Sequence, residues 1–230
     1  MSHKANITRI KAVSNSLAHL KDKVVFVGGA TVSLYADRSA IEIRPTDDVD
    51  IVVEIATKWG YAELEEQLRK IGFQNDVNSK YIGRYNLTGI IIDVMPTDIS
   101  ILGFTNVWYE SGFKTAIDYA IDAQHIVKIF SSPYFIASKL EAFKNRGCND
   151  GRTSTDFEDI VFVLENRRTI WDEMKEADEK IRSYLIQEFK KLHINPYLEE
   201  WVDAHAPASS SFILNDLENF IAFNLLIPNS

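Results

Sequence analysis

The stretch RPTDDVDIVVE, residues 44–54, leads three aspartates into an apolar, β-branched segment. This segment predicts a buried strand, and successive side chains of a strand point to opposite faces, so Asp48 and Asp50 share one face. Two carboxylates on one face repel each other unless a hard divalent cation such as Mg²⁺ lies between them. A polar turn before a strand is the other explanation, and Asp47 suits such a turn best.

A third carboxylate stands in GIIIDVMP, residues 89–96, which predicts another strand, ended by Pro96. Isoleucine and valine surround Asp93 in this segment, and an aspartate in such a setting is costly unless it is paired or binds a metal ion. If this strand lies beside that of Asp50, the three acids converge on one anionic pocket. Three carboxylates that hold two metal ions are the arrangement used for in-line nucleotidyl transfer.

The glycine pair Gly28 and Gly29 ends a short β-branched run and precedes a segment that can open a helix. Glycines at such a junction let backbone N–H groups approach a phosphate closely, beside the positive end of a helix. Most Gly-Gly pairs are simple turns, so phosphate binding here depends on the nearby aspartates.

Mixed strands and helices are predicted for the first half of the chain, and mostly helices for the second. Apolar side chains recur at helical spacing in the second half, where Thr155 and Glu158 also have the spacing of a capping box. We therefore expect an α+β fold with a core over residues 1–130 and a helical region over residues 131–230.

The composition is that of a globular protein with an excess of acidic residues: 46% of the 230 residues are hydrophobic, and the net charge is −8. This charge argues against binding of nucleic acid through bulk charge, although a local basic patch is compatible with it. The single cysteine excludes an internal disulfide, and no signal-peptide pattern is present, so we expect a cytoplasmic protein. The apolar runs are far shorter than the roughly 20 residues that span a bilayer, so no membrane partner is expected.

Five ordered motifs can be compared with known families: VFVGGATVSLYADR (25–38), RPTDDVDIVV (44–53), IIDVMPTD (91–98), SPYFIASKLEAFKNRG (132–147) and TDFEDIVFVLENR (155–167). Together they resemble the AbiEii-type nucleotidyltransferases of bacteria and archaea. That family is a branch of the polymerase-β-like superfamily and includes toxins of toxin–antitoxin systems. The resemblance covers about residues 24–190.

The resemblance implies a polymerase-β-like core with a mixed sheet, and an active site that the helical region completes. It implies metal binding at Asp48 and Asp50, with Asp93 as the third carboxylate, which would help to activate the acceptor hydroxyl. It also implies that Gly28 and Gly29 bind the triphosphate.

Two departures from the family pattern make the phosphate contacts a weaker expectation than the metal site. Ala30 stands where many relatives have Ser or Thr, so Thr31 is the candidate for that hydroxyl. The spacing from Gly29 to Asp48 is also longer than in the compact superfamily motif.

In the helical region the resemblance implies functional roles for Lys139, Arg146, Asp156 and Asp159. Lys139 and Arg146 are two helical turns apart and share a face, which suits either binding of phosphates or a solvated basic surface. The two aspartates lie near the start of their helix, where acids also favour the helix dipole. We expect Asp159 to pair with a basic residue of the preceding helix, and Asp156 to lie near the active site.

These expectations combine into a nucleotidyltransferase that moves a nucleoside monophosphate from an NTP to an acceptor, with two Mg²⁺ ions. The resemblance makes tRNA a candidate acceptor, a protein being the other possibility, and a cognate antitoxin a possible partner. The alternative is a catalytically silent nucleotide-binding or protein-interaction module with the same fold. Three acids that bind nothing would be difficult to explain in such a module.

Overall fold

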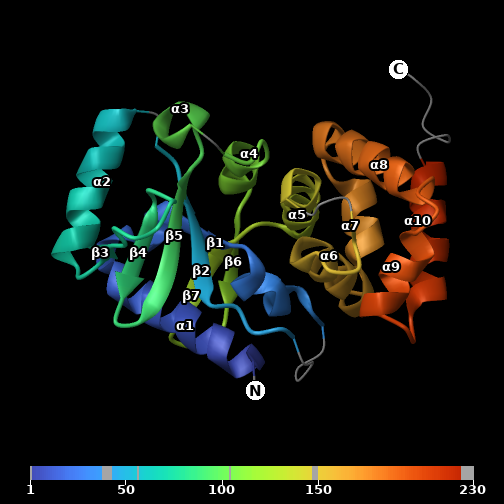
Figure 1. Ribbon diagram of the computed structural model, residues 1–230, viewed down its shortest axis with the longest axis horizontal. Coiled ribbons are helices and arrows are strands. Elements are labelled where there is room, and N and C mark those ends of the chain that lie inside the picture. Colours follow the sequence, from blue (N-terminus) through green and yellow to red (C-terminus); the bar gives the residue numbers. More distant parts are fainter. Residues whose placement is uncertain (1, 38–42, 56, 104, 147–149, 224–230) are drawn as a thin grey trace. The chain divides into compact units, whose positions relative to one another are not determined.

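The computed structural model describes residues 2–37, 43–55, 57–103, 105–146 and 150–223 (Figure 1). The chain divides into two compact units, which we call the sheet unit and the helical unit. The sheet unit comprises Met1–Leu34 and Ser39–Ser131, and the helical unit comprises Tyr35–Arg38 and Ser132–Ser230. The division at Ser131 and Ser132 lies one residue from the expected boundary, and residues 35–38 belong with the helical unit.

The sheet unit is built on one mixed sheet of seven strands in the order β3-β4-β5-β2-β1-β7-β6. The strands are β1 (Val24–Val27), β2 (Asp48–Val53), β3 (Gln74–Asn75), β4 (Arg84–Leu87), β5 (Ile90–Pro96), β6 (Ile117–Ala120) and β7 (Ile126–Ile129). The pairs β2–β5 and β1–β7 are parallel, and the other four are antiparallel. The predicted mixed sheet is therefore confirmed.

The centre of this sheet is buried on both faces, which explains the continuous apolar runs of its strands. All four residues of β1 are buried, and so are the last three of β2. In β2 the carboxylates of Asp48 and Asp50 occupy the two half-buried positions, whereas Asp93 lies at a buried position within β5.

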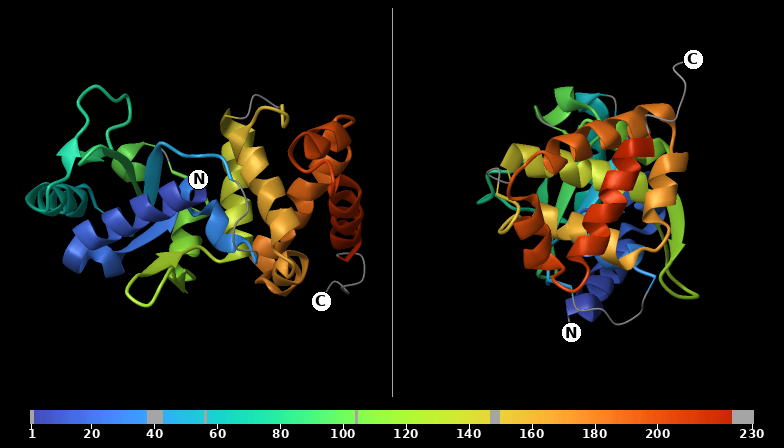
Figure 2. Two further views of the ribbon diagram at one scale, coloured as in Figure 1. Left: turned by 90° about the horizontal axis from the view of Figure 1, so that it is seen from below. Right: turned by 90° about the vertical axis from the view of Figure 1, so that its right-hand side faces the viewer.

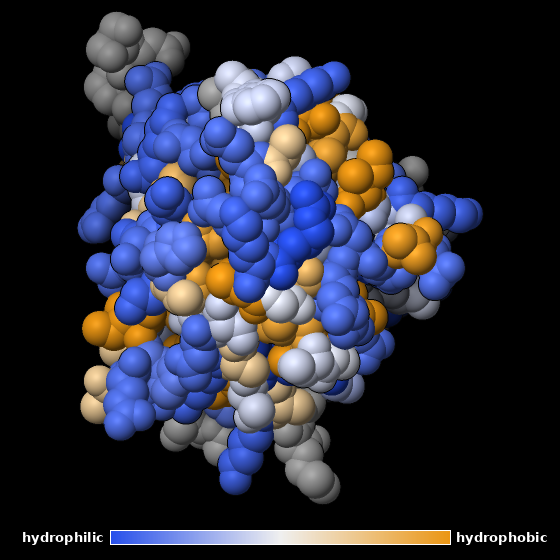
Figure 3. Space-filling model, turned by 90° about the vertical axis from the view of Figure 1, so that its left-hand side faces the viewer, coloured by the Kyte–Doolittle hydropathy of each residue, from blue (hydrophilic) through white to orange (hydrophobic). Residues whose placement is uncertain are grey.

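Helices of different lengths flank the sheet: α1 (Ser2–Leu17), η1 (Ala18–Lys23), η2 (Gly29–Tyr35), α2 (Lys58–Lys70), α3 (Ile99–Leu102) and α4 (Tyr109–Lys114). Helix α2 buries Tyr61, Leu64 and Leu68 at spacings of three and four residues, so one face packs inward. The hydroxyl of Thr57 accepts a hydrogen bond from the Gly60 N–H and caps this helix. The surface on the α2 side is chiefly hydrophilic, with separate apolar spots (Figure 3).

The helical unit contains α5 (Ser132–Arg146), α6 (Thr155–Asn166), α7 (Ile170–Glu176), α8 (Glu179–His193), α9 (Leu198–His205) and α10 (Ser210–Phe223). Helix α5 packs against α6, α7 and α8, and α10 lies across α7, α8 and α9 (Figure 2). The helical C-terminal region is confirmed. None of the helices in the described part of the chain is long and apolar enough to cross a membrane.

One local prediction for α6 is wrong: the capping residue is Ser154, not Thr155. The Ser154 hydroxyl accepts a hydrogen bond from the Phe157 N–H, and its backbone is extended, with φ −78° and ψ 117°. Glu158 donates its N–H to the Ser154 carbonyl, so Glu158 already lies within the first turn. Both Ser and Thr cap helices well, and here the preceding serine takes that position.

Candidate metal site

The pairing of β2 with β5 brings the three predicted carboxylates together. In the parallel register Asp50 lies opposite Asp93, and Asp48 lies two residues away on the same face of β2. One oxygen from each carboxylate lies within 4.8 Å of the others. The adjacency that the sequence analysis assumed is therefore confirmed, and the triad can hold a metal ion.

The carboxylates of this acidic triad differ in their exposure to solvent. Asp93 is 9% exposed and lies deep in the site. The Asp48 side chain is 37% exposed, so the triad is open to solvent on this side. The three side chains offer carboxylate oxygens, which are the donors that Mg²⁺ and Mn²⁺ prefer over softer metals.

Gly28 lies directly against the triad, where β1 ends. Its φ of +72° is in the left-handed region, and a Cβ built on it would lie 1.8 Å from Oδ2 of Asp50. Any larger residue would be strained and would displace this carboxylate. Gly28 thus leaves room for the Asp50 carboxylate within the triad, and its role in binding phosphate stays a prediction.

Gly29 and Thr31 pack into the protein around the same turn. A Cβ on Gly29 would meet a guanidinium nitrogen of Arg44 at 2.7 Å and Cγ2 of Thr46 at 2.8 Å. Thr31 is fully buried, and its hydroxyl donates a 2.9 Å hydrogen bond to the Gly28 carbonyl. Thr31 therefore stabilises the turn in this structure, and a contact of its hydroxyl with phosphate stays a prediction.

Arg84 is the residue of this site that the sequence analysis missed. It lies on β4, directly opposite Asp93 in the antiparallel β4–β5 pair. Its Nε donates to Oδ1 of Asp93 at 2.7 Å, and its Nη2 donates to Oδ2 at 2.6 Å. The same Nη2 lies 3.6 Å from Oδ2 of Asp48. The guanidinium thus provides a positive charge among the carboxylates.

A hairpin turn in the sequence could have revealed Arg84. Thr88 and Gly89 both have positive φ, which is the signature of a two-residue type I′ turn. The strands that flank this turn pair from Leu87 and Ile90 outward, which puts Arg84 opposite Asp93. Gly89 between two strand-like segments was the readable part of this signal, whereas Thr88 is not a usual residue of such a turn.

The electrostatic effect of this arrangement is largest on Arg84. The hydrogen bond to Asp93 raises the pKa of the guanidinium above its ordinary value, although partial burial opposes the rise. The three carboxylates outnumber the Arg84 guanidinium that pairs with two of them, which is compatible with a site for a divalent cation.

Lys139, Arg146, Asp156 and Asp159 form a second charged cluster, within the helical unit. Lys139 Nζ lies 2.6 Å from Oδ2 of Asp159 and 3.1 Å from Oδ1 of Asp156. Arg146 donates to both oxygens of Asp156, at 2.7 and 2.9 Å. The expected pairing of Asp159 with the preceding helix is confirmed.

Burial distinguishes the two basic residues of this cluster. The Lys139 side chain is 6% exposed and the Arg146 side chain 70%, so a solvated basic face is the wrong description for Lys139. Burial would lower the pKa of Lys139, but the carboxylates of Asp159 and Asp156 outweigh it and raise this pKa. Burial likewise opposes ionisation of Asp156, yet Arg146 and Lys139 lower its pKa. Lys139 and Asp156 are therefore both charged at neutral pH.

The two clusters belong to different units, the triad to the sheet unit and the Lys139 cluster to the helical unit. Contacts of Lys139 and Arg146 with nucleotide, and a catalytic role for Asp156, stay predictions. No protein-family model and no curated protein sequence matches the chain. The resemblance to a nucleotidyltransferase family therefore stays a prediction as well.

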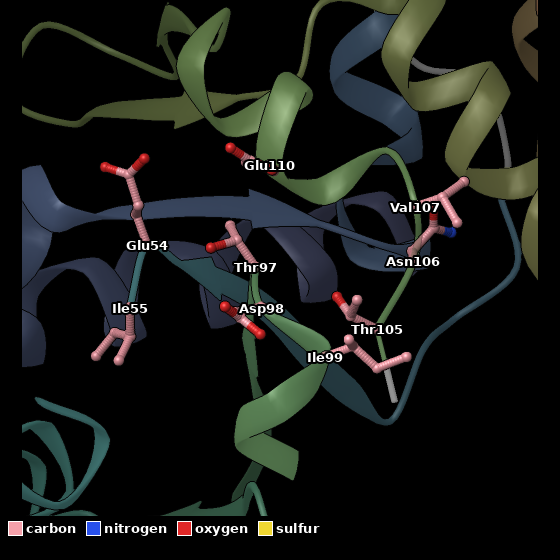
Figure 4. Close-up of a pocket in the computed structure, with 9 residues that line it drawn as sticks. All are labelled: Glu54, Ile55, Thr97, Asp98, Ile99, Thr105, Asn106, Val107 and Glu110. Atoms are coloured by element: carbon pink, nitrogen blue, oxygen red, sulfur yellow. The ribbon is translucent and has the colours of Figure 1, made fainter. Parts of the chain in front are cut away.

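A separate hollow of about 490 Å³ lies at the other end of β2 and β5, where these parallel strands finish (Figure 4). Glu54, Asp98 and Glu110 line it together with polar and aliphatic side chains, and none of the described lining residues is basic. Among the described residues only the triad brings three carboxylates within reach of a single ion. The hollow is therefore acidic but lacks the convergence of a metal site.

Proposed function

We propose that the protein is a Mg²⁺-dependent nucleotidyltransferase, which moves a nucleoside monophosphate from an NTP to an acceptor. The observation that carries the proposal is the register of β2 and β5, which aligns Asp50 with Asp93 and keeps Asp48 on the same face. Carboxylates from two adjacent strands, open to solvent on one side, suit metal-assisted transfer at a phosphate.

Each residue of the triad has a proposed role. Asp48 and Asp50 would hold the metal, and two bound Mg²⁺ ions would polarise the attacking oxygen and neutralise charge on the triphosphate. Asp93 would complete the ligand set and orient the acceptor hydroxyl. Gly28, by leaving room for the Asp50 carboxylate, keeps these oxygens in place.

The acceptor and the partners follow from the resemblance to AbiEii-type toxins. We propose tRNA as the first acceptor to test, a protein as the second, and a cognate antitoxin as a partner that would restrain activity. Lys139 and Arg146 would contact phosphates, and Asp156 would keep both basic groups in position. The net charge of −8 gives no independent support to an RNA acceptor.

Arg84 is the observation that favours a second candidate function, a catalytically silent module. Its guanidinium already pairs with Asp93 through two hydrogen bonds, so the buried acid has a partner without any metal. The acids would then serve only as structural ion pairs. Such a module would bind nucleotide or another protein without turnover.

The test is transfer of label from each α-³²P-labelled NTP in the presence of Mg²⁺ and total cellular RNA. Asp48→Asn should abolish labelling, whereas Asp118→Asn, which makes the same charge change on the exposed strand β6, should leave it intact. Label in RNA supports an RNA acceptor, and label in protein redirects the acceptor. If neither is labelled although NTP binds, the silent module is the better description.

A further inference from the structure

The Arg84 guanidinium contacts carboxylate oxygens that a bound metal ion would need. Its Nη2 lies 2.6 Å from Asp93 and 3.6 Å from Asp48, so the group stands between two of the three carboxylates. Mg²⁺ binds such oxygens at about 2.0–2.1 Å and would be repelled by a guanidinium at the same oxygens. A divalent ion and Arg84 therefore compete for Asp93.

The backbone around Arg84 is tightly fixed, which aims the side chain at the triad. A Cβ on Gly83 would lie 2.4 Å from the Val94 carbonyl, and Gly83 itself accepts a hydrogen bond from the Val94 N–H. Tyr81 donates its hydroxyl to that same Val94 carbonyl, at 2.7 Å. The strand β4 is thus held against β5 immediately beside Arg84.

The Arg84 side chain, in contrast, has room to leave. It is 30% exposed, and its long aliphatic stem can turn the charged end toward solvent. Asp93, with a side chain 12% exposed, cannot follow. A charge-assisted pair of hydrogen bonds would be exchanged for coordination of the same carboxylate to a metal ion.

We propose that Arg84 is an internal counter-cation of the metal site, which neutralises Asp93 in the metal-free protein and is displaced when a divalent ion binds. It is a positioning residue, because it keeps the carboxylates close together before the ion arrives. The released guanidinium then lies at the mouth of the site, where it suits a polyphosphate. This inference rests on the metal-binding part of the proposed function and adds how the site is regulated.

The test is the affinity for Mn²⁺, measured by electron paramagnetic resonance of the free ion, with no NTP present. We expect Arg84→Gln to bind Mn²⁺ about tenfold more tightly than the wild type, since the competitor is gone. Arg84→Lys keeps the charge but loses the two-pronged contact, so its affinity should be intermediate. The matched control is Arg69→Gln, which removes the same charge from the exposed side of α2 and should change affinity by less than about twofold.

Several results would overturn the inference. Equal or weaker Mn²⁺ binding by Arg84→Gln would exclude competition, and so would a lack of metal binding by every variant. If Arg84→Gln bound Mn²⁺ more tightly but Arg84→Lys bound it as the wild type does, the effect would come from charge alone, without displacement. Equal tightening in Arg69→Gln would show an effect of net charge.

A second measurement uses the wild type and covers the case in which Arg84→Gln does not fold. The Nε–H signal of Arg84, assigned by its loss in Arg84→Lys, reports on the hydrogen bond to Oδ1 of Asp93. Titration with Mg²⁺ should move this signal toward the position of solvent-exposed arginines, and an unmoved signal would refute displacement. Neither measurement depends on nucleotidyl transfer, so absence of transfer would refute the proposed function and leave this inference standing.

Discussion

The buried pair of Lys139 with Asp159 allows a quantitative prediction for the stability of the helical unit. At an effective dielectric constant of about 20, charges 2.6 Å apart attract by about 6 kcal/mol. Desolvation of each ion offsets several kcal/mol of this attraction, and removal of one partner from such buried pairs destabilises by about 3–5 kcal/mol. We therefore expect Lys139→Met to lower the free energy of unfolding by about 3–5 kcal/mol, because Asp159 is 2% exposed and would lose its cation.

A double substitution isolates the charge effect from the loss of packing. Lys139→Met with Asp159→Leu replaces the pair by apolar groups and should recover most of the lost stability, while Asp156 keeps Arg146. Lys144→Met on the same helix is the control: its side chain is 40% exposed, and its ion pairs should contribute less than about 1 kcal/mol.

The assay is urea unfolding at pH 7, followed by circular dichroism, with the two units fitted as separate transitions where they separate. The effect should fall on the transition of the helical unit. A loss below about 1 kcal/mol in Lys139→Met, or a double variant less stable than the single one, would refute the reasoning from a buried unpaired charge.

Three further predictions concern pH, the turn beside the acidic triad and a helix cap. Because the pKa of Asp156 is lowered in the fold, its charge stabilises the protein above the unfolded pKa near 4, and this stability is lost as the pH falls through the folded pKa. Because the pKa of Lys139 is raised, its charge stabilises the protein below the unfolded pKa of about 10.4, and this stability is lost as the pH rises through the folded pKa. Unfolding in Asp156→Asn should therefore depend less on pH below 4, as acid titration would measure. Gly28→Ala should weaken Mn²⁺ binding at least about tenfold and destabilise the fold. Gly89→Ala is the control and should destabilise the fold less, because φ is also positive there but the added Cβ meets nothing within 4 Å. Equal effects of the two variants would exclude the clash with the Asp50 carboxylate. Thr57→Ala should cost about 1 kcal/mol through loss of the α2 cap, and an unchanged urea midpoint would contradict this.

The triad could be predicted from the sequence because its signal was local. Polar residues inside β-branched runs are costly, and Asp93 carried that signal by itself. The pairing of β2 with β5 was only assumed, since strand neighbours depend on the whole chain. Parallel strands are linked through long connections, which contain no register signal of their own.

The burial of the Lys139 side chain could not be predicted from the sequence of its own helix. Its spacing to Arg146 suited a basic surface, and the burial comes from α6, which supplies Asp156 and Asp159. The predicted pairing of Asp159 with the preceding helix was nevertheless confirmed, because the consecutive helices α5 and α6 pack against each other. Arg84 was missed because the turn at Thr88 and Gly89 was not read as a hairpin.

The length of this hairpin turn limits which insertions and deletions the chain can accept. The two-residue turn pairs Leu87 with Ile90, and each step away from the turn pairs the next residue on either strand. Arg84 therefore lies opposite Asp93. Insertion or deletion of one residue between Leu87 and Ile90 would shift the pairing by one step, and the residue opposite Asp93 would become Gly83 or Tyr85. The length of a surface loop therefore determines which side chain meets the deepest carboxylate of the site, and viable changes in that loop should conserve its length.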